Sequence, residues 1–122
     1  MIKIDYKDGR SLHEQIEEGI KSLIISGILK ADEQLPSVRE MSLSLTVNPN
    51  TVQKAYKQLE SDGFICSIKG KGNFVSSLPE KKDVKRIEEL YELLSETAKE
   101  LKFYGEDKKE AEMIIKNIWE GF

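Results

Sequence analysis

The segment LPSVREMSLSLTVNPNTV, residues 35–52, contains two helix start signals in close succession. Ser37 can cap a helix, and Glu40 can reach back to the backbone of Ser37, which makes a capping box. Asn48 is a second capping residue, and Pro49 follows it at the first helical position, where the missing N–H costs nothing. The pattern predicts a short helix that ends near Thr46 and another helix that begins directly behind it.

Apolar spacing predicts the buried faces of these helices and adds a helix upstream, at about residues 11–26. The later helix is expected to end at Asp62-Gly63, because a glycine after the last periodic residue is a typical stop signal. The expected inward positions are Val38, Met41 and Leu45 in the short helix, Val52, Ala55, Tyr56 and Leu59 in the later helix, and Leu12, Ile16, Ile20, Leu23 and Ile24 upstream.

Two short strands are expected after the last of these helices, at residues 64–68 and 73–75. The connection between them, KGKG at 69–72, contains the glycines of a tight hairpin. Together with the helices, this predicts a mainly α fold with a small β-hairpin wing, that is, a winged helix-turn-helix domain with a basic wing tip.

A C-terminal tail follows a segment without hydrophobic period at about 76–82, which we interpret as a hinge. We therefore expect a domain at 1–76 and a helical tail at 77–122 that forms a two-helix dimerisation hairpin. The tail is too small for a core of its own, so a homodimer contact is favoured over packing on the first helix of the same chain. The expected contact residues are Val84, Ile87, Tyr91, Leu94, Ala98, Leu101, Ile114, Ile115 and Ile118.

Composition sets limits on the class of protein. A chain of 122 residues has room for one modest core and an extension. It contains no apolar run of the roughly 20 residues that a membrane span needs, its first residues do not resemble a secretory signal, and Cys66 is its only cysteine. We expect a cytoplasmic protein without an intrachain disulfide.

The net charge of -3 would ordinarily argue against nucleic-acid binding, which depends on lysine and arginine. The charge is unevenly distributed, however. Residues 77–122 contain nine basic and twelve acidic residues, whereas residues 1–76 contain ten of each. Within 34–76 the balance is positive, so the predicted helices and wing are locally basic.

Two close helices followed by a hairpin are the arrangement in which the later helix enters the major groove of DNA and the hairpin touches the flanking backbone. Asparagine and glutamine pair well with adenine, and lysine donates to guanine. Asn50, Gln53 and Lys54 therefore form a candidate base-reading set on the exposed face of the later helix. Arg39, Thr51 and Lys57 are better suited to phosphates.

Several short motifs occur together in the predicted domain: LPSVRE at 35–40, NPNTV at 48–52, LE at 59–60, GFI at 63–65 and GKGNFV at 70–75. In combination they resemble the GntR family of winged helix-turn-helix transcriptional regulators, over roughly residues 10–76. The NPNTV motif, the following Ala55-Tyr56 and the short tail are similar to the YtrA-like branch of that family.

The resemblance implies a bacterial repressor that dimerises through two C-terminal helices and binds an inverted-repeat operator, often to control neighbouring membrane-transporter genes. A repressor that acts by occupying its operator requires no cofactor for binding. The family's DNA contacts fall on Arg39, Asn50, Thr51, Gln53 and Gly70 of this sequence. To these, charge and position add Lys54, Lys57, Lys69 and Lys71.

Two positions depart from the family's pattern. Thr46 lies where the family often has a glycine in the turn between the two helices, and a β-branched residue disfavours positive φ. The turn is therefore either not left-handed or strained. Pro49 replaces a frequent arginine and removes one base contact that the family would otherwise imply.

Other classes of function fit the residues less well. A winged-helix adaptor that binds a protein is the alternative, but the polar and basic face is unlike the core of a protein interface. An enzyme is not expected, because the chain has no recognisable catalytic or metal-ligand constellation. His13 is interpreted as solvent-facing and Cys66 as a small packed residue. A small-molecule effector could bind at the dimer interface or the hinge, and the sequence does not identify one.

Overall fold

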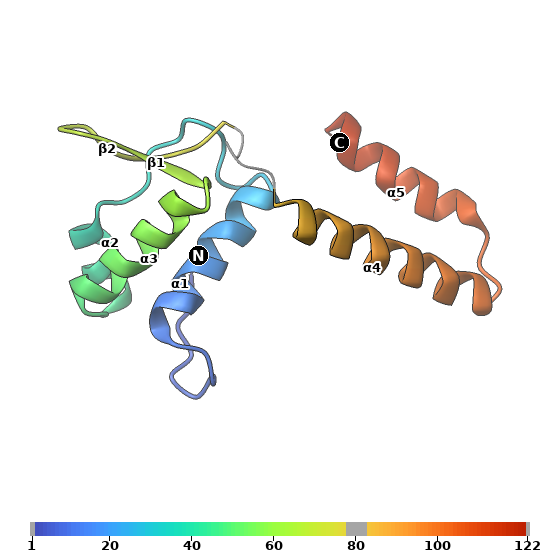
Figure 1. Ribbon diagram of the computed structural model, residues 1–122, viewed down its shortest axis with the longest axis horizontal. Coiled ribbons are helices and arrows are strands. Elements are labelled where there is room, and N and C mark those ends of the chain that lie inside the picture. The colour runs from blue at the N-terminus through green and yellow to red at the C-terminus, as the bar shows by residue number, and fades with distance from the viewer. Residues whose placement is uncertain (1, 78–82, 122) are drawn as a thin grey trace. The chain divides into compact units, whose positions relative to one another are not determined.

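The computed structural model describes residues 2–77 and 83–121 (Figure 1). The chain divides into two compact units, Met1–Lys81 and Lys82–Phe122. Most of the hinge predicted at 76–82 lies outside the described residues. The first unit contains α1 (Leu12–Ile25), α2 (Val38–Leu45), α3 (Pro49–Ser61), β1 (Ile65–Ile68) and β2 (Gly72–Val75). The second unit contains α4 (Val84–Phe103) and α5 (Lys108–Glu120). The predicted fold class, mainly helical with one hairpin, is confirmed.

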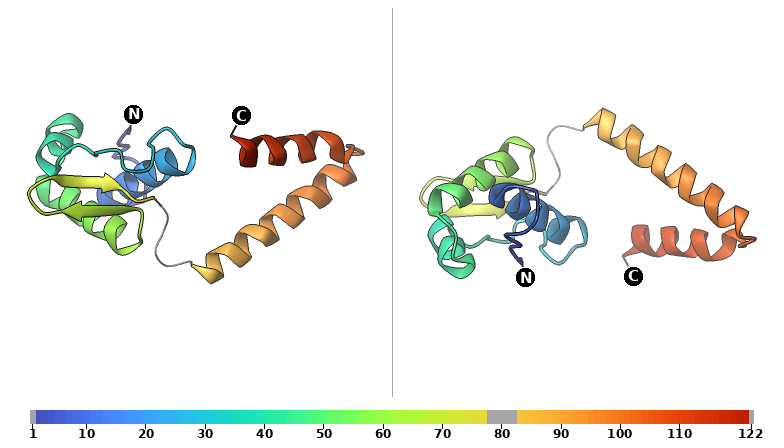
Figure 2. Two further views of the ribbon diagram at one scale, coloured as in Figure 1. Left: turned by 90° about the horizontal axis from the view of Figure 1, so that it is seen from above. Right: turned by 90° about the horizontal axis from the view of Figure 1, so that it is seen from below.

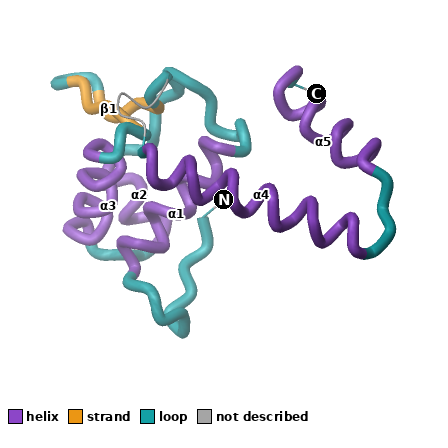
Figure 3. The backbone as a smooth tube through the Cα atoms, turned by 45° about the vertical axis from the view of Figure 1, so that its right-hand side comes forward, coloured by secondary structure: helices purple, strands orange, loops and turns teal. Residues whose placement is uncertain are grey.

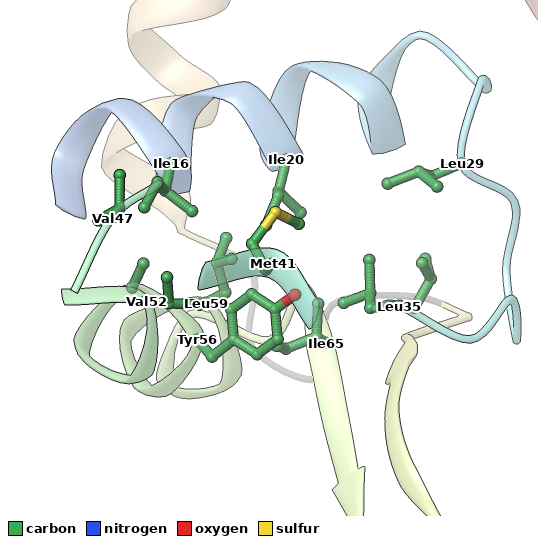
Figure 4. Packing of buried hydrophobic residues seen from close by; sticks show 12 residues of the cluster. Ile16, Ile20, Leu29, Leu35, Met41, Val47, Val52, Tyr56, Leu59 and Ile65 are labelled. Atoms are coloured by element: carbon green, nitrogen blue, oxygen red, sulfur yellow. The ribbon is translucent and has the colours of Figure 1, made fainter. Parts of the chain in front are cut away.

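The core of the first unit lies where α3 packs against α1, α2 and β1 (Figure 4). Ile16 and Ile20 of α1 are fully buried, as are Val52 and Leu59 of α3. Five side chains predicted to face inward are only partly buried: Leu12, Leu23, Ile24, Val38 and Leu45. The remaining buried apolar side chains are Leu29, Leu35, Met41, Val47, Ala55, Tyr56, Ile65 and Val75.

Both predicted helix start signals are present. The Ser37 N–H donates to Glu40 Oε1 at 3.1 Å, and the Glu40 N–H donates to Ser37 Oγ at 3.0 Å, which completes the capping box of α2. Asn48 Oδ1 accepts from the Asn50 N–H at 2.8 Å, and Pro49 is the first residue of α3. These caps satisfy backbone donors that would otherwise have no partner, and they fix where α2 and α3 begin.

The turn between α2 and α3 is left-handed at Thr46, with φ 55° and ψ 48°. Of the two alternatives left open for this turn, the strained one is therefore correct. A left-handed conformation costs a residue other than glycine about 1–2 kcal/mol. The turn is stabilised by the buried hydroxyl of Ser42, which donates to the carbonyl of Val47 at 2.6 Å.

The hairpin is antiparallel, with Ile65 opposite Val75 and Ile68 opposite Gly72 (Figure 3). The loop that leads into α2 adds a partner along β2. The Leu35 N–H donates to the Asn73 carbonyl at 2.8 Å, and a single bridge joins Gln34 to Phe74. The same loop continues into the cap of α2. It therefore connects the position of the hairpin to that of α2.

The second unit consists of two helices joined by a short turn, and Figure 2 shows that they splay apart from that turn. Neither α4 nor α5 has a buried residue in the single chain. Asp83 caps α4 by accepting from the Arg86 N–H, and Asp107 caps α5 by accepting from the Lys109 N–H. Among the described residues, no helix is both long and apolar enough to cross a membrane.

Candidate nucleic-acid interface

The outward face of α3 carries the side chains predicted to read bases. Asn50, Gln53 and Lys54 are exposed, and with Lys57 and Gln58 they line one shallow, open depression. The opposite face of the same helix is buried in the core, so packing determines the direction in which this polar face points. Thr51 is half-buried at the start of the helix.

Arg39 lies on α2 and is exposed. Its neighbour Glu40 is engaged in the capping box, where the Ser37 N–H holds the pKa of the Glu40 carboxyl below its usual value. In the part of the chain that the structure describes, no ion pair involves any of the five basic residues assigned to DNA contact, which are Arg39, Lys54, Lys57, Lys69 and Lys71. Their charges are therefore available to neutralise phosphates.

The three residues of the wing tip, Lys69–Lys71, are exposed. Gly70 has φ +78°, and a Cβ added there would meet nothing within 4 Å. The glycine is therefore required by the backbone conformation of the turn, and the open space around it leaves room for a phosphate. In Figure 1, α2, α3 and the hairpin tip lie on the left-hand side of the first unit, with α1 to their right.

Sequence reasoning missed Gln34, whose side-chain amide donates to the carbonyl of Lys71 at 2.9 Å. No periodicity or motif marks this residue, because its partner Lys71 lies in the hairpin, 37 positions away in the sequence. Tyr56 was predicted only as a core residue. Its hydroxyl also donates to the carbonyl of Pro36 at 2.7 Å.

Two of the interpretations drawn for single residues are wrong. His13 is not solvent-facing, since its side chain is 24% exposed and its Nδ1 lies 3.2 Å from Glu17 Oε1 on the next turn of α1. Cys66 is not packed. It is exposed, and Ile65 is the one buried residue of β1. Among the described residues no cluster of three potential metal ligands occurs.

All the residues predicted to form the dimer contact are exposed in the single chain, as are the other residues of α4. Tyr91 is 68% exposed and Ile118 is 66% exposed. On α4 the predicted residues are Val84, Ile87, Tyr91, Leu94, Ala98 and Leu101, and on α5 they are Ile114, Ile115 and Ile118.

Comparison with known families gives a match to the bacterial regulatory proteins of the gntR family over residues 12–75, from α1 to the last residue of β2. This chain belongs to the gntR family. The gntR match thus covers the helix-turn-helix and the wing, and α4 and α5 lie outside it.

Two relatives of this gntR-family chain come from Bacillus subtilis. The HTH-type transcriptional repressor YtrA is 45% identical over 76 residues, which are 62% of this chain and 58% of YtrA. The HTH-type transcriptional regulator YhcF is 31% identical over 116 residues, which are 95% of this chain and 96% of YhcF. The chain thus matches less than two thirds of YtrA but nearly the whole of YhcF, including the tail.

A third relative is the DNA-binding domain of AraR, solved in complex with the operator ORE1. It is 28% identical to this gntR-family chain, with a TM-score of 0.54, and the match covers 62% of this chain and 93% of the AraR domain. The AraR domain, whose fold is similar to that of the first unit, was therefore solved bound to operator DNA.

Proposed function

We propose that this gntR-family regulator represses transcription by occupying an inverted-repeat operator as a homodimer. The observation that carries the proposal is the outward face of α3, where amide and ammonium groups stand exposed beside basic residues that have no acidic partner among the described residues. The operator complex of the AraR domain supports the same use of the fold.

Within this proposal, the side chains divide by role. Asn50, Gln53 and Lys54 lie in the first half of α3, the part of a recognition helix that meets base edges. Each can donate to groups in the major groove, and the two amides can also accept. Arg39, Thr51, Lys57, Lys69 and Lys71, with the backbone at Gly70, contact phosphates and set the register of the domain on the duplex.

The second unit supplies the twofold symmetry in this proposal. The exposed apolar positions of α4 and α5 associate with those of a second copy, because two splayed helices cannot cover them within one chain. A twofold dimer places two α3 helices in successive major grooves, which matches an inverted repeat. The first unit is then the DNA-binding domain and the second the dimerisation tail.

The cellular role follows from this mechanism. Occupation of the operator blocks transcription without a chemical step, so the proposal requires neither enzymatic activity nor a cofactor. The protein acts in the cytoplasm, where bacterial operators are located. We propose membrane-transporter genes beside its own gene as the regulated set, which is what the resemblance to the YtrA-like branch of the family implies.

The proposal is tested by selection of bound duplexes from a random DNA pool at about 0.15 M salt, which corresponds to screening in the cell. Enrichment of an inverted repeat supports specific dimeric readout and provides the operator. Binding without enrichment, which disappears as salt rises, contradicts specific readout and leaves nonspecific association or a protein-binding adaptor.

A further inference from the structure

The wing tip depends on few contacts for its conformation. Its turn is closed by the Lys71 N–H, which donates to the Ile68 carbonyl at 2.9 Å, and all three tip residues are exposed. Among the described residues, one side chain bonds to this tip from outside the hairpin. Gln34 Nε2 donates to the carbonyl of Lys71 at 2.9 Å, across 37 positions of sequence.

The backbone around Gln34 is itself fixed along β2. Gln34 forms a bridge with Phe74, the Val75 N–H donates to the Glu33 carbonyl at 2.9 Å, and the Leu35 N–H donates to the Asn73 carbonyl at 2.8 Å. The amide of Gln34 therefore projects from a segment whose position is already determined. The same segment continues into the capping box of α2.

Gly72 leaves the space that this amide occupies. A Cβ added at Gly72 would lie 2.9 Å from Gln34 Nε2, closer than real Cβ contacts, and Gly72 has φ +123°, a conformation that other residues rarely adopt. The hydrogen bond and the glycine thus favour the same arrangement, in which the wing tip rests on Gln34.

We propose that Gln34 is a positioning residue that holds the wing tip, so that Lys69 and Lys71 meet the phosphates of bound DNA. This inference rests on the proposed function. Gln34 acts through the carbonyl of Lys71 and needs no contact with DNA of its own. Ordering a loop at the moment of binding costs free energy, and a tip that is already held avoids part of that cost.

The test compares Gln34→Met, which keeps a similar length and loses the donor, with the matched change Gln15→Met. Gln15 uses its amide in the same way elsewhere, donating to the carbonyls of Asp5 at 3.0 Å and Arg10 at 3.2 Å, far from the wing in sequence. Operator affinity is measured by fluorescence anisotropy at several salt concentrations, with circular dichroism melts to show that each variant is folded. Both changes are repeated in a Lys69→Ala/Lys71→Ala background.

We expect Gln34→Met to weaken binding by up to about fivefold on all DNA sequences alike, which is the range of an exposed charge contact. The slope of log affinity against log salt falls by up to about one unit. Neither effect appears when the wing lysines are absent. Gln15→Met, by contrast, lowers the melting temperature and leaves affinity and salt slope unchanged.

Two results would overturn the role of Gln34 while leaving DNA binding intact: wild-type affinity and slope in Gln34→Met, or the same affinity loss with and without the wing lysines. A wild-type protein that binds no duplex at any salt concentration would overturn the proposed function itself. The wild-type titration therefore distinguishes the two failures.

Discussion

Tyr56 Oη on α3 donates a 2.7 Å hydrogen bond to the carbonyl of Pro36, in the loop that precedes α2. Tyr56 is 2% exposed and packs in the core, while its hydroxyl reaches the loop that pairs with β2 and leads into α2. One side chain therefore links α3, the loop before α2 and the hydrophobic core. Its apolar part was predictable from helical spacing, whereas its hydrogen bond was not.

Replacing Tyr56 by Phe removes this hydrogen bond and leaves the ring in place. We expect the free energy of unfolding of the first unit to fall by about 1 kcal/mol, as for a single hydrogen bond. Urea denaturation followed by circular dichroism measures the change. Tyr6→Phe is the matched control, because Tyr6 is 69% exposed, and it should leave the midpoint where it is. Equal midpoints for wild type and Tyr56→Phe would show that the bond contributes nothing.

The same phenol predicts a dependence on alkaline pH. Burial raises the pKa of Tyr56 to about 12, from an ordinary value near 10. The folded state therefore disfavours the phenolate, and the stability that this group contributes is fully present below about pH 10 and lost as the pH rises toward about 12. Urea denaturation across this pH range should show that the free energy of unfolding falls more steeply with pH for wild type than for Tyr56→Phe. If the free energy of unfolding fell equally with pH in the two proteins, the raised pKa of Tyr56 would be contradicted.

The left-handed turn at Thr46 predicts a stabilising substitution. Thr46→Gly relieves the strain at φ 55° but increases the entropy of the unfolded chain, so the net gain is about 1 kcal/mol or less. Ser44→Gly, within α2 and also exposed, should destabilise the protein, because glycine is a poor helix former. Urea midpoints that move in the same direction for both variants would refute the strain.

Gln53→Ala tests base reading on α3. Loss of a bidentate contact should reduce discrimination between the selected operator and single-base variants by about 1–3 kcal/mol at particular positions. Gln58→Ala provides the comparison, since Gln58 lies on the same face but toward the end of the helix that is farther from base edges. If Gln53→Ala instead lowered the affinity equally for every DNA sequence, Gln53 would belong among the contacts to the DNA backbone.

Leu94→Asp tests the tail. Leu94 is 48% exposed on α4, and a carboxylate there would be buried without a partner in a dimer. Analytical ultracentrifugation should find monomers at concentrations where wild type is dimeric, with affinity for an isolated half-site preserved. Ser95→Asp adds the same charge beside the apolar positions and should leave the dimer intact. A dimeric Leu94→Asp protein would remove this part of α4 from the interface.

The helices and strands of the first unit were predictable because each is marked locally in the sequence. Ser37, Glu40, Asn48 and Pro49 are start signals whose physics acts within a few residues, and apolar spacing identified the face of α3 that packs inward. Whatever depends on contacts across the fold escaped prediction. The amide of Gln34 on the wing and the hydroxyl of Tyr56 on Pro36 join segments that no local pattern relates.

The candidate interface was predictable to a similar extent. The residues expected on the outward face of α3 are exposed there, because the inward positions were recognised and the remainder faces away from the core. The interpretations of two single residues outside the periodic pattern were wrong. His13 is partly buried and lies against Glu17, and Cys66 is exposed on β1.

The absence of a core among the described residues of the second unit has a consequence for gene control. Under the proposed assembly, two chains must meet before either tail can bury its apolar side chains, so at low abundance the amount of active regulator grows with the square of the amount of chain synthesised. A modest decline in synthesis, or dilution as cells divide, then releases the operator sharply. A threshold of this kind arises from the tail alone and needs no signal molecule.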